Sequence, residues 1–204
     1  MKDNLKWLLL LPVAVLVAVV LIIFIPRIFS SDSSSDGNAG DSSKPQSQAT
    51  EQEITDIQKR IDAATELVTA NPADAEAIKE LGTGYYELGA VQAGSEDFNG
   101  SLRSYRDAIE QYRKYLNIRP DDPEVHVDLG LAYVEMGLID LGVRELQTAT
   151  VSAPSNQRAW HSLGWAFSQG GKVPEAREAW QKSYSLNPTS TVGQESKQFL
   201  DQTA

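Results

Sequence analysis

Few residues in this sequence have the types and spacing that metal or cofactor chemistry requires. The chain of 204 residues contains two histidines, His126 and His161, and no cysteine. The histidines are not paired at helical spacing and no His-Glu-x2-His run is present, so a transition-metal site is not expected. The lack of cysteine excludes thiolate metal sites, iron–sulfur clusters and disulfides. We therefore expect neither a metal nor a cofactor.

Two other clusters have simpler structural explanations. Gly82 and Gly84 could belong to a phosphate-binding loop, but no strand precedes them and no G-x-G-x2-G motif follows. The acidic run Asp121-Asp122-x-Glu124 lacks the ligand spacing of a calcium loop. Carboxylates at this place are instead favourable at the N-terminus of a following helix. Since no set of acid, base and nucleophile remains, we do not expect an enzyme.

Regularly spaced apolar residues predict helices rather than a reactive site. In the stretch from Trp160 to Pro188 they recur three and four apart in two segments, separated by Gly170-Gly171. A W-x2-L-G-x2-aromatic motif and an A-x3-aromatic motif consist of Trp160, Leu163, Gly164, Phe167, Ala176 and Trp180. This order and spacing resemble the tetratricopeptide repeat (TPR), a helix–turn–helix unit with a period of about 34 residues.

The same Leu-Gly-x2-aromatic motif begins nine residues after a proline three times. The pairs are Pro72 with Leu81, Pro120 with Leu129, and Pro154 with Leu163, and the last two registers are one TPR period apart. The resemblance therefore implies three repeats, at 75–122, 123–156 and 157–190. The expected fold is an all-α, right-handed superhelical solenoid of antiparallel helix pairs. His126 takes the slot of Trp160 in the second repeat, where a half-buried structural histidine is the better interpretation.

Three further features complete the predicted repeat domain, residues 53–204. The first repeat exceeds the TPR period by 14 residues, an insertion near 90–103. Continued helical spacing predicts two lengthened helices joined by a loop near Gly94 to Gly100, and a disordered loop of the same length is the alternative. A helix at 53–71 precedes the repeats, and a helix at 191–202 caps their last apolar surface.

The first 52 residues have a different composition. Trp7 to Ile25 is a run of 19 residues without a charge, about 28 Å long as a helix, which matches the hydrocarbon core of a bilayer. No clear Ala-x-Ala site follows, which favours an uncleaved anchor within residues 1–29 over a signal peptide. Lys2 and Lys6 precede the run, so the positive-inside rule places the N-terminus in the cytoplasm and the repeats outside it. Residues 30–52, rich in serine, aspartate and glycine, predict a flexible linker.

The net charge of −10 makes nucleic acid an unfavourable partner. The resemblance implies a protein partner instead, because the first helices of successive TPR units line a concave groove that receives a peptide or helix. The register gives Lys79, Thr83, Tyr86 and Glu87 as groove slots of the first repeat. It gives Val127, Leu131, Val134 and Glu135 in the second repeat, and His161, Trp165, Ser168 and Gln169 in the third.

The predicted groove has an apolar middle. Family members that bind the acidic tails of heat-shock chaperones use lysine, arginine and asparagine in these slots, where this chain has only Lys79, so an acidic tail is disfavoured. We expect Leu131, Val134 and Trp165 to bind an apolar or amphipathic segment, with Trp165 as the anchor. The helix from Pro123 to Met136 is apolar nearly all round, so the alternative is that the N-terminal helix or the inserted hairpin covers it.

The predicted function is a non-catalytic, membrane-anchored interaction scaffold or assembly factor. Its organisation resembles bacterial-type TPR proteins of the cell envelope. The alternative is a regulatory or ancillary subunit of a membrane complex, such as a cytochrome c maturation or protein translocation assembly. A small-x3-small pattern from Ala14 to Ala18 within the anchor favours that alternative.

Overall fold

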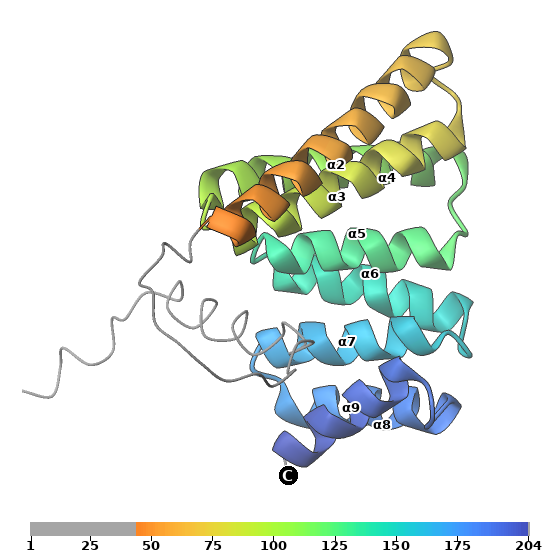
Figure 1. Cartoon of the computed structure of the whole chain (residues 1–204). Helices are drawn as coiled ribbons and strands as arrows, with labels where there is room; N and C mark the ends of the chain where they lie inside the picture. Colours follow the sequence, from red (N-terminus) through yellow and green to blue (C-terminus); the bar gives the residue numbers. More distant parts are fainter. Residues whose placement is uncertain (1–43, 204) are drawn as a thin grey trace, which may run out of the picture. The chain divides into compact units, whose positions relative to one another are not determined.

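The computed structural model describes residues 44–203, with side chains from Thr50 onward, and this part of the chain is helical apart from short turns. The helices are α2 (Lys44–Ala70), α3 (Ala75–Gly94), α4 (Phe98–Ile118), α5 (Pro123–Glu135), α6 (Ile139–Ser152), α7 (Gln157–Gln169), α8 (Val173–Leu186) and α9 (Thr191–Gln202). From α3 onward, successive helices pack as antiparallel pairs in a stack (Figure 1). The predicted all-α array of helix pairs is confirmed.

The predicted membrane anchor, Trp7 to Ile25, lies outside the described residues. Within 44–203, no helix combines the length and the apolar character that crossing a bilayer requires.

The 14 additional residues of the first repeat are helical. The helices of the next two repeats have 13 and 14 residues each, whereas α3 and α4 have 20 and 21. Each helix is thus seven residues, or about two turns, longer. The two extensions pack together, because Tyr105 lies against Gly89 and the Ser104 hydroxyl donates to the Gln92 side-chain oxygen at 2.7 Å. Only residues 95–97 form the loop between them, shorter than the loop predicted near Gly94 to Gly100.

The turns within the three repeats share one backbone geometry. Gly137 and Gly171 have φ values of +74° and +71° at equivalent places of successive repeats. In the first repeat Glu96 occupies this place with a φ of 65°. A left-handed conformation costs a residue with a side chain about 1–2 kcal/mol. The α3–α4 turn therefore contains local strain that the glycines avoid in the other two turns.

In each repeat a glycine of the first helix faces a large side chain of the second. The pairs are Gly82 with Tyr112, Gly130 with Leu146, and Gly164 with Trp180. A Cβ atom at Gly164 would lie 2.5 Å from the Trp180 indole, which is too close for any side chain. The Leu-Gly motif of the sequence therefore marks the point where the two helices of a repeat approach most closely.

Helix α2 packs on α3 ahead of the first complete repeat. Ile57, Ile61 and Ala64 of α2 form a buried cluster with Leu81 and Leu88 of α3. The helix begins at Lys44, nine residues before the predicted start at 53. Residues 44–52, predicted as linker, are therefore helical. Their sequence contains glutamine, alanine and glutamate without glycine, which favours helix.

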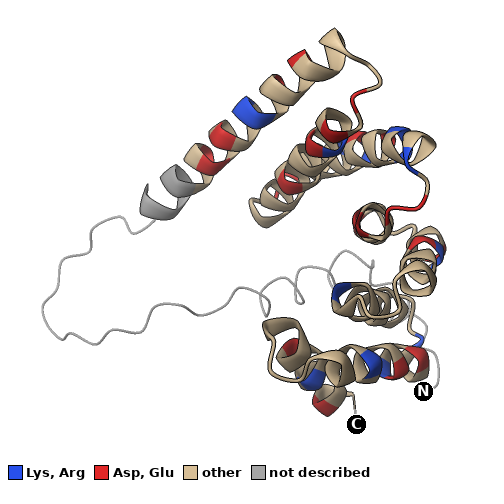
Figure 2. Cartoon of the chain, turned by 90° about the vertical axis from the view of Figure 1, so that its right-hand side faces the viewer, with Lys and Arg blue, Asp and Glu red and all other residues tan. Residues whose placement is uncertain are grey.

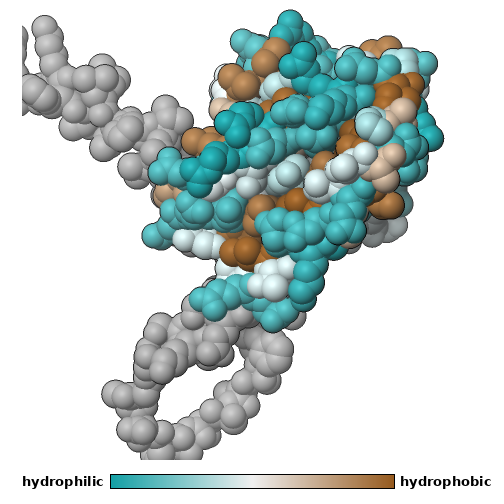
Figure 3. All heavy atoms as spheres, turned by 90° about the horizontal axis from the view of Figure 1, so that it is seen from above, coloured by the Kyte–Doolittle hydropathy of each residue, from teal (hydrophilic) through white to brown (hydrophobic). Residues whose placement is uncertain are grey.

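The stack is curved, and the first helix of each repeat lies on its inner side. Helices α3, α5, α7 and α9 contact one another in turn, and the helices together follow an arc (Figure 2). From the α2 end the surface is mainly polar, with separate apolar patches (Figure 3). A side chain on α3, α5 or α7 that points away from the paired helix therefore faces the inside of the curve.

Candidate protein-binding face

One set of slots on α3, α5 and α7 defines what we call the inner face. The slots follow the spacing i, i+4, i+7 and i+11, which keeps residues along one side of a helix. They hold Glu76, Glu80, Thr83 and Glu87 on α3; Glu124, Asp128, Leu131 and Glu135 on α5; and Arg158, Ser162, Trp165 and Gln169 on α7.

Leu131 and Trp165 form the apolar centre of the inner face. They occupy the same slot of α5 and α7 in successive repeats, and each is half-buried. Both pack against the hydrophobic core between these repeats. Each therefore has one side held by the core and retains part of its surface exposed. Thr83 holds the equivalent slot of α3 and is also half-buried.

The slot that the sequence assigned to Lys79, Val127 and His161 is turned toward the following layer. Lys79 Nζ lies 3.7 Å from a carboxylate oxygen of Asp122. Val127 is 0% exposed in the core between the second and third repeats. His161 Nδ1 lies 2.9 Å from the Ser196 hydroxyl of α9. These three residues hold successive layers together rather than lining an open surface.

The third predicted slot, which holds Tyr86, Val134 and Ser168, differs in exposure from one repeat to the next. Val134 is 6% exposed and packs in the same core as Val127, so a partner could not reach it. Tyr86 and Ser168 are half-buried, and the Tyr86 ring lies 5.4 Å from the ring of Tyr105, centroid to centroid.

Arginines bridge pairs of carboxylates on the inner face. Arg158 of α7 pairs with Glu124 of α5 at 3.1 Å and also with Asp128. The motif analysis did not identify this arginine, because its partners lie 30 and 34 residues away.

Arg60 of α2 forms the equivalent bridge at the other end of the inner face. It pairs with Glu80 at 3.1 Å and with Glu87 at 2.6 Å on α3. Exposed ion pairs of this kind each contribute little stability. The main consequence of these ion pairs is that the two arginine side chains are held beside the carboxylates of α3 and α5.

Family profiles cover the array from α4 to the start of α9. A profile described as "TPR repeat" matches residues 102–137, and one described as "Tetratricopeptide repeat" matches residues 127–191. Residues 102–191 of the chain are therefore tetratricopeptide repeats. Proteins of this family are typically non-catalytic, and the repeats suggest an interaction scaffold. No curated protein sequence matches the chain significantly.

Solved TPR structures share the fold at low sequence identity. TTC0263, a thermophilic TPR protein of Thermus thermophilus, has a TM-score of 0.62 and 18% identity, covering 74% of this chain and 77% of its own. MamA has a TM-score of 0.57 and 20% identity, covering 74% and 89%. The first TPR of Spaghetti (RPAP3), bound to the HSP90 peptide SRMEEVD, has a TM-score of 0.53 and 21% identity, covering 63% and 91%. At these identities the likeness shows the fold alone.

The TPR register explains His126 as a structural residue. Its Nε2 lies 3.0 Å from the carbonyl oxygen of Pro120. The indole nitrogen of Trp160 donates to the carbonyl oxygen of Pro154 at 2.9 Å. In both repeats, a ring nitrogen thus meets the proline carbonyl six residues earlier. The carboxylate of Glu145 lies 2.8 Å from His126 Nδ1 and holds the ring from the other side.

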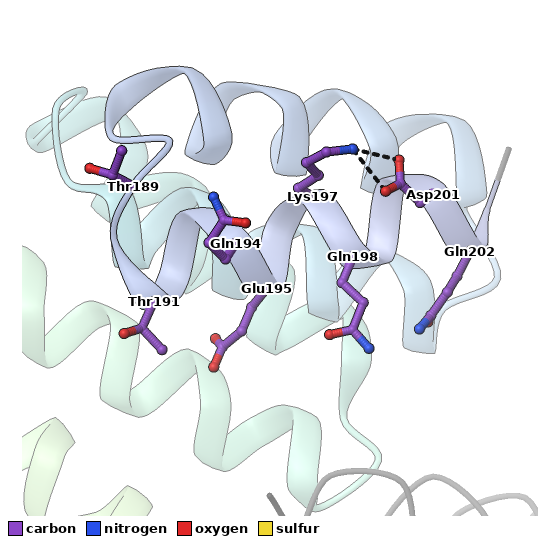
Figure 4. Close-up of a pocket in the computed structure, with 8 residues that line it drawn as sticks. All are labelled: Thr189, Thr191, Gln194, Glu195, Lys197, Gln198, Asp201 and Gln202. Atoms are coloured by element: carbon purple, nitrogen blue, oxygen red, sulfur yellow. Dashed lines mark hydrogen bonds and ion pairs between the residues drawn. The ribbon is translucent and has the colours of Figure 1, made fainter.

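Within the described part of the TPR array, no group of three or more metal-ligating side chains is present. A hollow on the exposed side of α9 is lined by polar residues of that helix and the turn before it (Figure 4). Lys197 and Asp201 pair along α9 at 2.8 Å, one helical turn apart. An open polar surface of this kind offers no apolar anchor for a ligand.

Glu135 differs from the other inner-face carboxylates of the TPR array. Its side chain is exposed, yet burial raises the pKa of its carboxyl group. Burial first, and then the charge of Glu135, raise the pKa of the Tyr86 and Tyr105 hydroxyls. No ion pair of Glu135 is present among residues 50–203.

The buried histidine of the last TPR repeat predicts a pH-dependent stability. Burial lowers the pKa of His161 from 6.5 to about 4, and its side chain is 17% exposed. The unfolded chain therefore binds a proton more readily, and stability should fall as the pH drops from about 6.5 toward 4. Between pH 7 and pH 4.5 a shift of this size corresponds to a loss of about 2 kcal/mol.

Urea unfolding of the full chain at pH 7 and pH 4.5 measures this loss. A His161→Gln variant, neutral throughout, isolates the histidine from the carboxylates that also titrate. The free energy of unfolding should fall less for this variant than for the wild type. An equal pH dependence for both proteins would show that His161 does not contribute.

Proposed function

We propose that this TPR protein is a non-catalytic scaffold or assembly factor that holds a segment of another protein on its inner face. The observation that supports this most strongly is the placement of Leu131 and Trp165. Both are packed by the core on one side, occupy equivalent slots of neighbouring repeats and retain exposed surface toward the inside of the curve. A rigid, half-buried tryptophan is the type of residue that dominates binding energy at interfaces.

We also propose that the scaffold acts at a membrane. The uncharged run from Trp7 to Ile25 would be a single-pass anchor, with the N-terminus in the cytoplasm and the TPR array on the other side. Residues 30–43 would span about 20 Å as a random coil between the anchor and α2. The array would therefore hold its partner close to the bilayer surface.

Replacement of Trp165 by alanine tests the binding face. The tagged full chain is crosslinked in intact cells, purified, and the co-purified proteins are quantified by mass spectrometry. We expect the recovery of the main partner to fall at least tenfold for Trp165→Ala, because a hot-spot residue contributes about 2 kcal/mol or more.

The matched control is Val151→Ala, since Val151 is 78% exposed near the end of α6 and lies away from the inner face. Its partner recovery should equal that of the wild type. Unchanged recovery for Trp165→Ala, in a variant with the wild-type unfolding midpoint, would contradict binding at the inner face.

A further inference from the structure

The inner face carries an excess of negative charge on its first two helices. The slots of α3 and α5 hold six carboxylates and no basic residue: Glu76, Glu80, Glu87, Glu124, Asp128 and Glu135. Arg119 pairs with Glu76, Arg60 with Glu80 and Glu87, and Arg158 with Glu124 and Asp128. Three arginines against six carboxylates leave three negative charges.

The carboxylates flank the apolar centre rather than forming a separate acidic cluster. Asp128 precedes Leu131 by three residues, and Glu135 follows it by four. At 1.5 Å per residue, each carboxylate lies about one helical turn from Leu131. Asp128 is already paired with Arg158, so a side chain that packs on Leu131 would have its neighbouring groups nearest to the unpaired charge of Glu135.

Glu135 is the one inner-face carboxylate of α3 and α5 that is not paired with an arginine of the described residues. It has no ion-pair partner among the described residues, although the surrounding protein excludes part of its water and raises its pKa. A carboxylate that lies near other protein groups and has no ion-pair partner attracts a cation more strongly than one surrounded by water alone. A cation brought by a ligand would form the missing pair.

We propose that the inner face selects a protein segment with a large apolar side chain flanked by lysine or arginine. The apolar side chain packs against Leu131 and Trp165, and a cationic group beside it lies next to Glu135. An acidic segment would meet the excess of three negative charges and is excluded. This inference rests on the proposed binding function and adds the chemistry of the partner.

Two short synthetic peptides test the proposal, each long enough to form about four turns of helix. They share the same leucines and differ only in having lysine or glutamate at the flanking positions. Their binding to the purified full chain is measured by fluorescence anisotropy at low and at physiological salt. We expect the lysine peptide to bind and to weaken with salt, and the glutamate peptide not to bind.

Two matched charge reversals distinguish attraction of the peptide by the inner face from attraction by the net charge of the protein. Glu135→Lys should weaken the lysine peptide about tenfold. Glu178→Lys makes the same change in net charge at an exposed position of α8 and should alter the affinity by less than about twofold. Equal losses for both variants would assign the attraction to the net charge of −10 and overturn the proposal.

Trp165→Ala distinguishes failure of this inference from failure of the proposed function. If the glutamate peptide binds as tightly as the lysine peptide and both depend on Trp165, the face binds segments but does not select charge. If neither peptide binds, or neither depends on Trp165, the stated partner chemistry is wrong. The partner recovery measured with Trp165→Ala in cells then decides the proposed function independently.

Discussion

Replacing Trp180 with alanine is expected to lower the free energy of unfolding by about 3–5 kcal/mol, the typical loss for a fully buried tryptophan. Trp180 of α8 is 1% exposed, fits against Gly164 of α7 and stacks on Phe199 of α9 with ring centroids 4.8 Å apart. Its removal would leave a cavity among three helices, and Gly164 has no side chain to fill it. Urea unfolding of the full chain, followed by circular dichroism, measures the loss.

Trp160→Ala is the matched control for this experiment. Trp160 is also a tryptophan of the third repeat, but it is half-buried and its indole donates to the carbonyl oxygen of Pro154. Its replacement should cost about 1–3 kcal/mol, from one lost hydrogen bond and partial burial. A loss for Trp180→Ala no larger than that for Trp160→Ala would contradict the packing that joins α9 to the last repeat.

The helices could be predicted because glycine, proline and apolar spacing mark them in the sequence. The distance of one repeat period between Leu129 and Leu163 set the register, and α5 to α9 lie within the predicted units. The insertion could be predicted as helix because the apolar spacing of Leu102 and Tyr105 continues the stripe of α4. The start of α2 was missed, because residues 44–52 carry no apolar stripe and their polar composition also suits a linker.

The candidate site was predicted less completely, because its slots depend on contacts between layers. The resemblance assigned both Leu131 and Val127 to the groove, yet Val127 is fully buried in the core that it shares with the third repeat. In the same way α9 covers His161, which no local pattern around His161 indicates. Arg60 and Arg158 were missed because their partners lie 20 to 34 residues away. The spacing of residues within one helix identifies a face of that helix, but it does not identify the residues of other helices that contact this face.

The apparent oddity of a histidine in a tryptophan slot has a physical explanation that sequence alone could not supply. His126 and Trp160 both present a ring nitrogen to a proline carbonyl of the preceding turn. In these two repeats the slot holds a planar ring with a nitrogen at its edge, whereas the first repeat has Ile78 there, buried in the core. Glu145 accounts for the remaining ring nitrogen of His126, so neither nitrogen needs a metal or a substrate.

Site-specific photocrosslinking from the inner face tests the central claim most directly. A photoreactive amino acid replaces Leu131 in one version of the full chain and Val151 in another, and both are irradiated in intact cells. Val151 is, among the described residues, the most exposed large apolar side chain, so it reports attraction to any apolar surface. We expect a discrete adduct with a partner protein from position 131 and none from position 151. An adduct of equal yield at position 151, or none at position 131, would contradict a scaffold that binds its partner on the inner face.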